Sequence, residues 1–262
     1  MLNMNRKSSQ HNDQNAKSAS SKLSVAHISK LIRKGEYYDP VMPPKRNPLG
    51  LHGTSSQVLY TLFDTGILPT DRERTGFIYV APAWSRKLET WYSKSGLDVM
   101  KFSNFSSFSS AYSKAEDYAM MNEDYRGMVS ILINSGIKSE YANSLAMLIQ
   151  FGDEPKPKSI RIPTWLPEDQ RALFEIVYEQ LLDIAYVGNR LSAMHNTEPR
   201  GVIIGINSKV LDDLKIIPDP DLADSLIIEC NSGLDAKYIE GIKTLNVNGK
   251  KLIEQYFNLR RK

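Results

Sequence analysis

The stretch that decides the fold is LHGTSSQVLYTLFDTGILP, which runs over residues 51–69. After a polar start, its apolar side chains recur at helical spacing on one face: Val58, Leu59, Leu62 and Phe63. Thr54 or Ser55 can cap this helix, and Gly66 can end it in a left-handed conformation shortly before Pro69. The stretch therefore predicts a strand, a polar loop and an amphipathic helix in succession.

His52 is expected to lie at the lip of that strand, beside the backbone N–H groups and hydroxyls of the helix N-terminus. Such a place suits a polar or anionic ligand. The alternative interpretation is an ordinary loop histidine, and this stretch alone favours neither.

The composition of the chain fits a soluble globular protein, with 262 residues, 41% hydrophobic and 24% charged. The formal net charge of +3 gives no electrostatic case for nucleic acid as the main partner. The single cysteine, Cys230, excludes an internal disulfide and is expected to be a small buried hydrophobe in preference to a nucleophile. The four histidines lack ligand spacing, so we expect no metal.

No apolar run approaches the roughly 18 residues of a membrane span, and we expect no membrane partner. The N-terminus has no apolar stretch after its charges, which argues against a secretory signal peptide. We expect a soluble chain, cytoplasmic or exported without a classical signal. Residues 1–23 are rich in Ser, Asn, Gln and Lys, and predict a disordered basic tail that is simply solvated.

The rest, residues 24–262, is predicted to be one α+β domain with β-rich ends and a helical middle. Helices are expected from the Ser24 cap to Gly35, over 83–94, after the serine-rich run at 104–113, through a block at about 125–197, and at the C-terminus. Strands are expected at 75–81, 98–102, 201–206, 226–230 and 238–245.

Three pieces in this order resemble the ADP-ribosyltransferases of the diphtheria-toxin and poly(ADP-ribose) polymerase type. The first is Leu51-His52-Gly53-Thr54 with Thr65-Gly66-Ile67-Leu68, similar to that family's "HGT … GL" element. The second is Phe108-Ser109-Ser110 with Ala115-x-x-Tyr118-Ala119. The third, Gly233 to Ile242, is similar to the family's terminal "E-Y-I" strand.

The resemblance implies two small, mostly antiparallel sheets that clasp NAD+ in a cleft, with the block at 125–197 as a helical insertion. It implies that His52 bonds the adenosine ribose, that the Gly53 backbone pairs with the nicotinamide amide, and that Thr54 lies at the ribose. It places Ser109 in the same site, and Phe108 and Tyr118 on either side of the nicotinamide ring, where stacking and cation–π attraction favour a cationic ring.

One departure from the family pattern concerns the catalytic carboxylate. Lys237 stands where the resemblance expects a glutamate, and a lysine cannot stabilise a cationic, oxocarbenium-like transition state. Asp235, on the same face of a strand as Lys237, could substitute for it. Glu240 or Glu229 could instead be the catalytic residue, or the site could have lost its activity.

Three hypotheses follow. The leading one is an NAD+-dependent ADP-ribosyltransferase that releases nicotinamide and modifies an acceptor, which we expect to be a protein. The second is a catalytically inactive NAD+- or partner-binding module on the same fold. The third is an unrelated α+β domain. A disordered tail on a compact transferase would also suit a secreted bacterial effector, and the helical block is expected to choose the acceptor or to cover the cleft.

Overall fold

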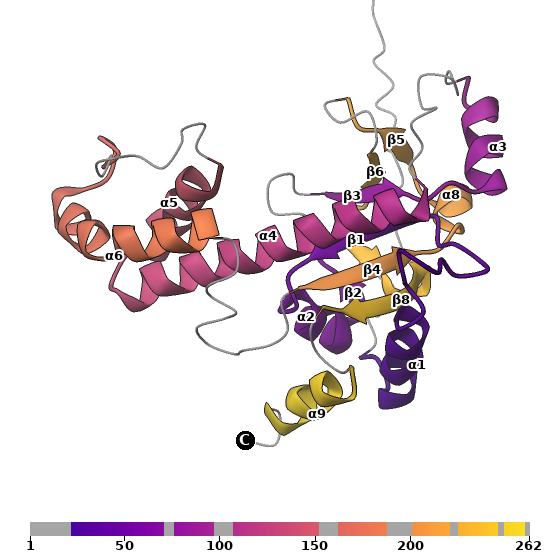
Figure 1. Cartoon of the computed structure of the whole chain (residues 1–262), viewed down its shortest axis with the longest axis horizontal. Helices are drawn as coiled ribbons and strands as arrows, with labels where there is room; N and C mark the ends of the chain where they lie inside the picture. The colour runs from indigo at the N-terminus through magenta and orange to yellow at the C-terminus, as the bar shows by residue number, and fades with distance from the viewer. Residues whose placement is uncertain are drawn as a thin grey trace, which may run out of the picture.

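The computed structural model describes residues 22–70, 76–96, 107–151, 162–187, 201–220, 225–245 and 249–259. Figure 1 shows a sheet with helices around it, and an arm of helices that projects to one side. The expected strand at 98–102 lies outside the described residues, as does the expected tail up to residue 21. Leu23, which we assigned to the tail, donates its backbone N–H to Phe63 O at 3.0 Å and packs on the core.

The main sheet has six strands in the order β5-β6-β3-β1-β4-β8, and all of its neighbours are antiparallel. Their bounds are β1 Gly50–Thr54, β3 Phe77–Pro82, β4 Val202–Ile206, β5 Ile216–Pro218, β6 Leu226–Glu229 and β8 Ile239–Thr244. A separate ribbon joins β2 (Ile67–Leu68) to β7 (Leu234–Asp235). The prediction of a mixed α and β protein with antiparallel strands is thereby confirmed.

In the middle of the sheet, β1 and β3 are paired over a short stretch, at Gly50–Pro82 and Leu51–Ala81, which we call the seam. Strand β1 pairs with β4 along all five of its residues, but among the described residues its register with β3 holds only at Gly50–Pro82 and Leu51–Ala81. Beyond Leu51 the two strands diverge. The sheet therefore consists of two three-stranded antiparallel halves, β5-β6-β3 and β1-β4-β8, that meet at this seam.

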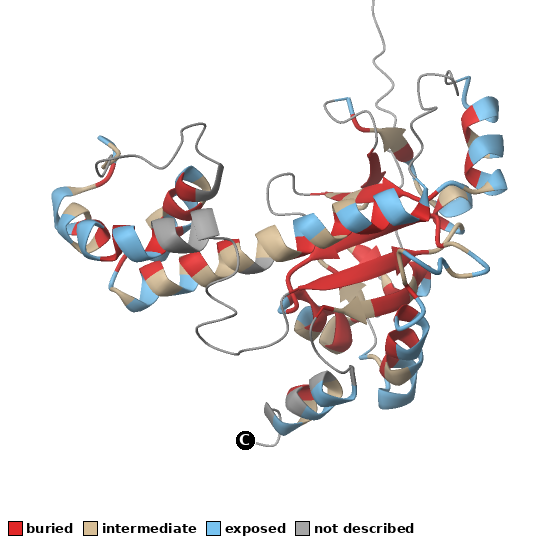
Figure 2. Ribbon diagram, in the orientation of Figure 1, coloured by how far each residue is buried: buried red, intermediate tan, exposed pale blue. Residues whose placement is uncertain are grey.

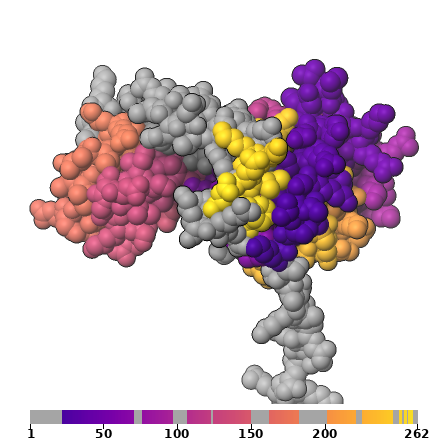
Figure 3. All heavy atoms as spheres, turned by 90° about the horizontal axis from the view of Figure 1, so that it is seen from below, coloured from indigo at the N-terminus to yellow at the C-terminus, as the bar shows by residue number. Residues whose placement is uncertain are grey.

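One face of the sheet carries the largest apolar core. It is covered by α1 (Val25–Gly35), α2 (Val58–Thr65) and α9 (Gly249–Leu259). The predicted cap of α1 is confirmed, since Ser24 Oγ accepts the His27 N–H at 3.2 Å. The predicted end of α2 is also confirmed, because Gly66 has a φ of 70°. Figure 3 shows α1 and α9 side by side on this part of the molecule.

The other face is crossed by α4 (Phe108–Asn134), which begins at the Ser107 cap. A stripe of small residues, Ala111, Ala115 and Ala119, lies buried against the sheet. A Cβ atom added to Gly53 would lie 1.8 Å from Ala115 O. A Cβ atom added to Gly201, whose φ is 117°, would lie 2.6 Å from Ala119 O. These two glycines therefore let the helix backbone rest directly on β1 and β4.

The arm is built from the second half of α4 with α5 (Ser139–Phe151) and α6 (Glu168–Val187). It has its own apolar core, whose buried residues colour parts of the ribbon of these helices red in Figure 2. At about 1.5 Å per residue, α4 is about 40 Å long and belongs to both parts. The helical block was expected to start at 125, but helix is continuous from Phe108, and residues 188–197 lie outside the described residues.

Two other predicted boundaries were wrong. Helix α3 (Arg86–Lys94) begins later than residue 83, because Ser85 Oγ accepts the Leu88 N–H and caps it there. Strand β8 begins at Ile239, because Ala236–Tyr238 form a 3-10 turn whose N-terminus Asp235 caps. A short helix, α8 (Val210–Asp213), connects β4 to β5.

Candidate functional site

His52 lies in the middle of β1 and is buried, where we had expected it at the lip of the strand. Its neighbours Leu51 and Gly53 face α4, so the imidazole points toward the opposite side of the sheet. Its Nδ1 lies 2.7 Å from the Tyr79 carbonyl oxygen on β3. This bond spans the two strands just beyond the seam, where their register has ended.

The tautomer of His52 follows from that bond. A carbonyl oxygen can only accept, so Nδ1 must carry the hydrogen and donate it to Tyr79 O. In the neutral ring, Nε2 is then an acceptor. The imidazole is therefore buried and held in one orientation by β3.

A run of buried polar residues follows His52 into helix α2: Thr54, Ser55 and Ser56. The predicted capping by Thr54 or Ser55 was wrong, because the N-cap is Gln57 and no side chain bonds the first turn of α2. Ser55 Oγ instead accepts the Gln57 N–H at 3.3 Å, which bends the chain between strand and helix. The loop is thus polar, enclosed and locally held, as expected for a binding loop.

The loop is also tied to α4. Arg126 Nη1 donates to Gln57 Oε1 at 3.0 Å, and Arg126 stands where α4 leaves the sheet and enters the arm. Together with the close approach of Ala115 to Gly53, this bond fixes the His52-Gly53-Thr54 strand and its loop against one helix.

The two aromatic residues predicted to sandwich a nicotinamide ring do not lie opposite each other. Phe108 and Tyr118 are ten residues apart on the same straight helix, so they stand about 15 Å apart along its axis. One ring cannot contact both at stacking distance. Phe108 is buried and packs on Tyr38, with ring centroids 6.2 Å apart, whereas Tyr118 is 39% exposed. The serine-rich run before Phe108 had suggested a strand end, but Ser107, the residue of that run just before Phe108 that the structure describes, caps the helix.

A second group of predicted residues gathers around Tyr38, at the first turn of α4. Ser109 Oγ donates to Pro40 O at 2.5 Å. The Glu240 carboxylate lies close enough to Tyr38 for its charge to shift the pKa of the Tyr38 phenol. Burial, and next the Glu240 charge, raise the pKa of that phenol. The phenol fits between Gly205 and Gly241, where any Cβ would collide with it. Phe108, Ser109 and Glu240 therefore gather around Tyr38, whose core cluster on the α4 side of the sheet also holds Leu51 and Ala81 of the seam.

The remaining carboxylates predicted from the sequence have structural partners. Glu229 forms an ion pair with Lys215 at 2.7 Å, near the outer edge of the sheet. Asp235 Oδ1 accepts the Lys237 N–H at 2.8 Å. The prediction that Asp235 and Lys237 share a face of one strand was wrong, because Lys237 lies in the 3-10 turn, where its ammonium stands 4.7 Å from the centre of the Tyr238 ring.

The structure shows a polar cluster that the sequence did not reveal. Lys114 Nζ on α4 donates to Ser225 Oγ at 2.9 Å, and Ser225 O accepts the Asp219 N–H at 3.0 Å. Ser225 and Asp219 are both buried, and Asp219 is the one buried carboxylate among the described residues. Leu226, the next residue, pairs with Val80, so the cluster lies beside the seam on the α4 side of the sheet. We call Lys114, Asp219 and Ser225 the seam cluster.

Asp219 was overlooked because Pro218 and Pro220 surround it, and such a segment is typical of an exposed turn. Only the pairing of β5 with β6 shows that it is enclosed. Buried carboxylates are rare in proteins and gather at functional sites, so the position is a candidate in its own right.

Within the described part of the chain, no group of three or more His, Cys, Asp or Glu side chains could hold a metal ion. None of the described helices is long and apolar enough to cross a membrane. Comparisons with protein-family models, with curated proteins and with solved structures gave no match. The function of the site is therefore inferred from its own geometry and from the motifs of the chain.

Proposed function

We propose that this protein is an NAD+-dependent ADP-ribosyltransferase that moves ADP-ribose to an acceptor and releases nicotinamide. The observation that carries the proposal is the place of His52. It lies at the point where two three-stranded antiparallel halves separate, with Nδ1 held by Tyr79 O and a buried polar loop after it. The resemblance implies two small, mostly antiparallel sheets that clasp NAD+, and we take the two halves of this sheet as those two sheets.

In this proposal the imidazole of His52 contacts the adenosine ribose of NAD+, which is the role that the resemblance implies for it. Thr54 projects from the same face of β1 as His52 and offers a hydroxyl beside it. Gly53 contributes backbone alone, since its Cα is pressed against Ala115 O. The expected two-sided aromatic stack is not part of the proposal, and Tyr118 is the aromatic residue of that pair that remains exposed.

The reaction needs a negative charge near the ribose whose bond to nicotinamide breaks, because positive charge develops on that sugar. Asp235, Glu240 and Glu229 contact other parts of the fold. Asp219 is buried with Lys114 and Ser225 on the α4 side of the sheet, whereas His52 points to the opposite side, so Asp219 is not the carboxylate of this proposal and the choice stays among Asp235, Glu240 and Glu229. The acceptor atom forms its bond to the anomeric carbon as the bond to nicotinamide breaks, and it loses its proton to water or to a nearby base.

A nicotinamide-release assay on four single variants tests the proposal. We expect one of Asp235→Asn, Glu240→Gln and Glu229→Gln to lower the rate by about 100-fold or more, and Asp219→Asn, on the other side of the sheet, to stay near wild type. The variant that loses the rate assigns the carboxylate, and a loss confined to Asp219→Asn would contradict the placement of the ribose at His52. No release by the wild-type protein with any acceptor offered would contradict transferase activity.

The second candidate is a non-catalytic binding module. It is favoured by the lysine at position 237 and by the structural roles of Asp235 and Glu229. It predicts that NAD+ binds to the wild-type protein and is recovered intact. Titration calorimetry followed by chromatography of the nucleotide distinguishes this outcome from turnover.

A further inference from the structure

The arm differs in charge from the rest of the chain. The described residues of its helices and of the loop before α6, over 125–151 and 162–187, carry six acidic and three basic side chains, whereas the whole chain has a net charge of +3. Most of the acidic groups are exposed on one helix, α6: Glu168, Asp169, Glu175 and Glu179. The described helices of the arm therefore carry more negative than positive charge, and most of the negative charge is exposed on α6.

Apolar side chains are exposed on the same arm. Trp165, just before α6, is 50% exposed, and its ring lies 6.3 Å from that of Tyr141 on α5. Leu148 is also exposed and lies two helical turns after Tyr141, so the two side chains share one edge of α5. We call Tyr141, Leu148 and Trp165 the aromatic edge.

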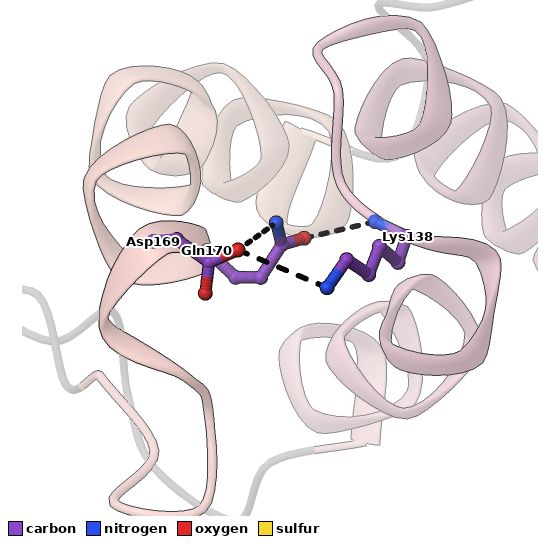
Figure 4. Close-up of polar contacts among 3 residues, drawn as sticks. All are labelled: Lys138, Asp169 and Gln170. Atoms are coloured by element: carbon purple, nitrogen blue, oxygen red, sulfur yellow. Dashed lines mark hydrogen bonds and ion pairs between the residues drawn. The ribbon is translucent and has the colours of Figure 1, made fainter.

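The edge is held in a fixed geometry. Figure 4 shows the contact between the start of α5 and the start of α6: the Lys138 N–H donates to Gln170 Oε1 at 2.9 Å, and Lys138 Nζ lies 3.8 Å from Asp169 Oδ2. Arg171 Nε and Nη2 donate to Leu166 O and Thr164 O at 2.7 and 2.8 Å, and so fix the loop that carries Trp165. A preorganised apolar surface binds at a lower entropic cost than a mobile one.

Acidic groups lie next to the aromatic edge. A hydrogen bond to Glu140, followed by burial and the charges of Glu140 and Asp169, raises the pKa of the Tyr141 phenol. Exposed aromatic rings beside carboxylates attract lysine and arginine side chains, through ion pairing and cation–π contact. The same negative charge repels nucleic-acid phosphates and anionic lipid surfaces.

We propose that the arm docks a lysine- and arginine-rich segment of a partner protein, with the aromatic edge as its apolar contact and the carboxylates of α6 as its charged contacts. The inference concerns a surface remote from the seam and does not depend on NAD+ chemistry. If the transferase proposal also holds, α4 links the docked partner to the His52 loop through Arg126.

The test uses the whole protein and a synthetic helical peptide of about four turns, in which lysines surround a face of leucines. Titration calorimetry compares it with the same peptide carrying glutamate for every lysine. We expect the lysine peptide to bind and the glutamate peptide not to bind. Trp165→Ala should lower the affinity for the lysine peptide about tenfold, as expected for an aromatic anchor.

The chain offers a matched control in Trp84, which is also 50% exposed but lies in the sheet-bearing part, between β3 and α3. Trp84→Ala should change the affinity less than twofold, or about the error of the method. The double variant Glu175→Gln/Glu179→Gln, on an exposed helix face, should weaken binding several-fold and more so at low salt. Equal effects of Trp165→Ala and Trp84→Ala, or equal binding of both peptides, would overturn the proposal.

Discussion

Tyr112 lies buried on the first half of α4, with the Lys243 ammonium 5.3 Å from the centre of its ring. Burial, and next the charges of Glu116 and Asp39, raise the pKa of the Tyr112 phenol to about 12. The phenol sits where a negative charge would face a low dielectric and two carboxylates. The neutral side chain is thus the form that the fold requires.

This raised pKa makes stability depend on alkaline pH. The contribution of neutral Tyr112 is fully present below the ordinary tyrosine pKa of 10.0 and is lost as the pH rises toward about 12, because the unfolded chain releases the proton first. We expect Tyr112→Phe to show a smaller loss of unfolding free energy over that interval than wild type. Urea unfolding at a series of pH values measures it, with exposed Tyr37→Phe as the control. Identical pH profiles for wild type and Tyr112→Phe would contradict this account.

At this scale residue types could be predicted to matter from the sequence, but their partners could not be predicted. The sequence singled out His52 from a local polar pattern, but the bond to Tyr79 O joins positions 27 residues apart and needs the sheet register. It could not find Asp219, because burial there comes from pairing between strands. It also favoured Phe108 as a ligand contact, whereas that ring packs against Tyr38.

Among the elements, α4 has the largest effect on the arrangement of the site. Its alanine stripe brings a helix backbone onto β1 and β4, and Gly53 and Gly201 make the approach possible. Gly53 thus has a packing role whatever the ligand. The helix was predicted only in part, since the serine run before it suggested a strand, while the locally coded ends of α1 and α2, Ser24 and Gly66, were predicted correctly.

We expect Gly53→Ala to lower the free energy of unfolding by about 3 kcal/mol or more, because its Cβ would meet backbone atoms that cannot move aside. Gly96→Ala is the control, since no atom lies within 4 Å of its Cβ position and its φ of 69° alone costs about 1 kcal/mol. Denaturant unfolding measures both. A Gly53→Ala protein as stable as Gly96→Ala would contradict the close packing of α4 on β1.

The whole molecule has separate apolar cores on the sheet and in the arm. Phe63 is fully buried in the first and Phe174 in the second. The helical block around 125–197 was predicted from its composition. The sequence could not predict that this block forms an arm with its own core. Periodicity shows that a helix has an apolar face, but it does not show which other element covers that face.

Two cores predict that the arm can open by itself. Phe174→Ala should lower the free energy of unfolding of the arm by about 3–5 kcal/mol, because it leaves a cavity in the arm's core. Amide hydrogen exchange should then accelerate in α5 and α6 while β1 and β4 stay protected. Phe63→Ala should instead accelerate exchange in β1 and β4. Equal acceleration of arm and sheet by Phe174→Ala would show a single cooperative unit.

The most direct test of the central claim is titration of NAD+ into the wild-type protein and into His52→Asn. The amide of asparagine can still donate to Tyr79 O but lacks the rest of the imidazole ring, so this contact within the fold is kept while the proposed ribose contact is lost. The account predicts that wild type and the exposed-surface control His27→Ala bind NAD+ alike, and that His52→Asn binds about tenfold or more weakly. Equal NAD+ affinity for all three proteins, or no binding by wild type, would contradict it.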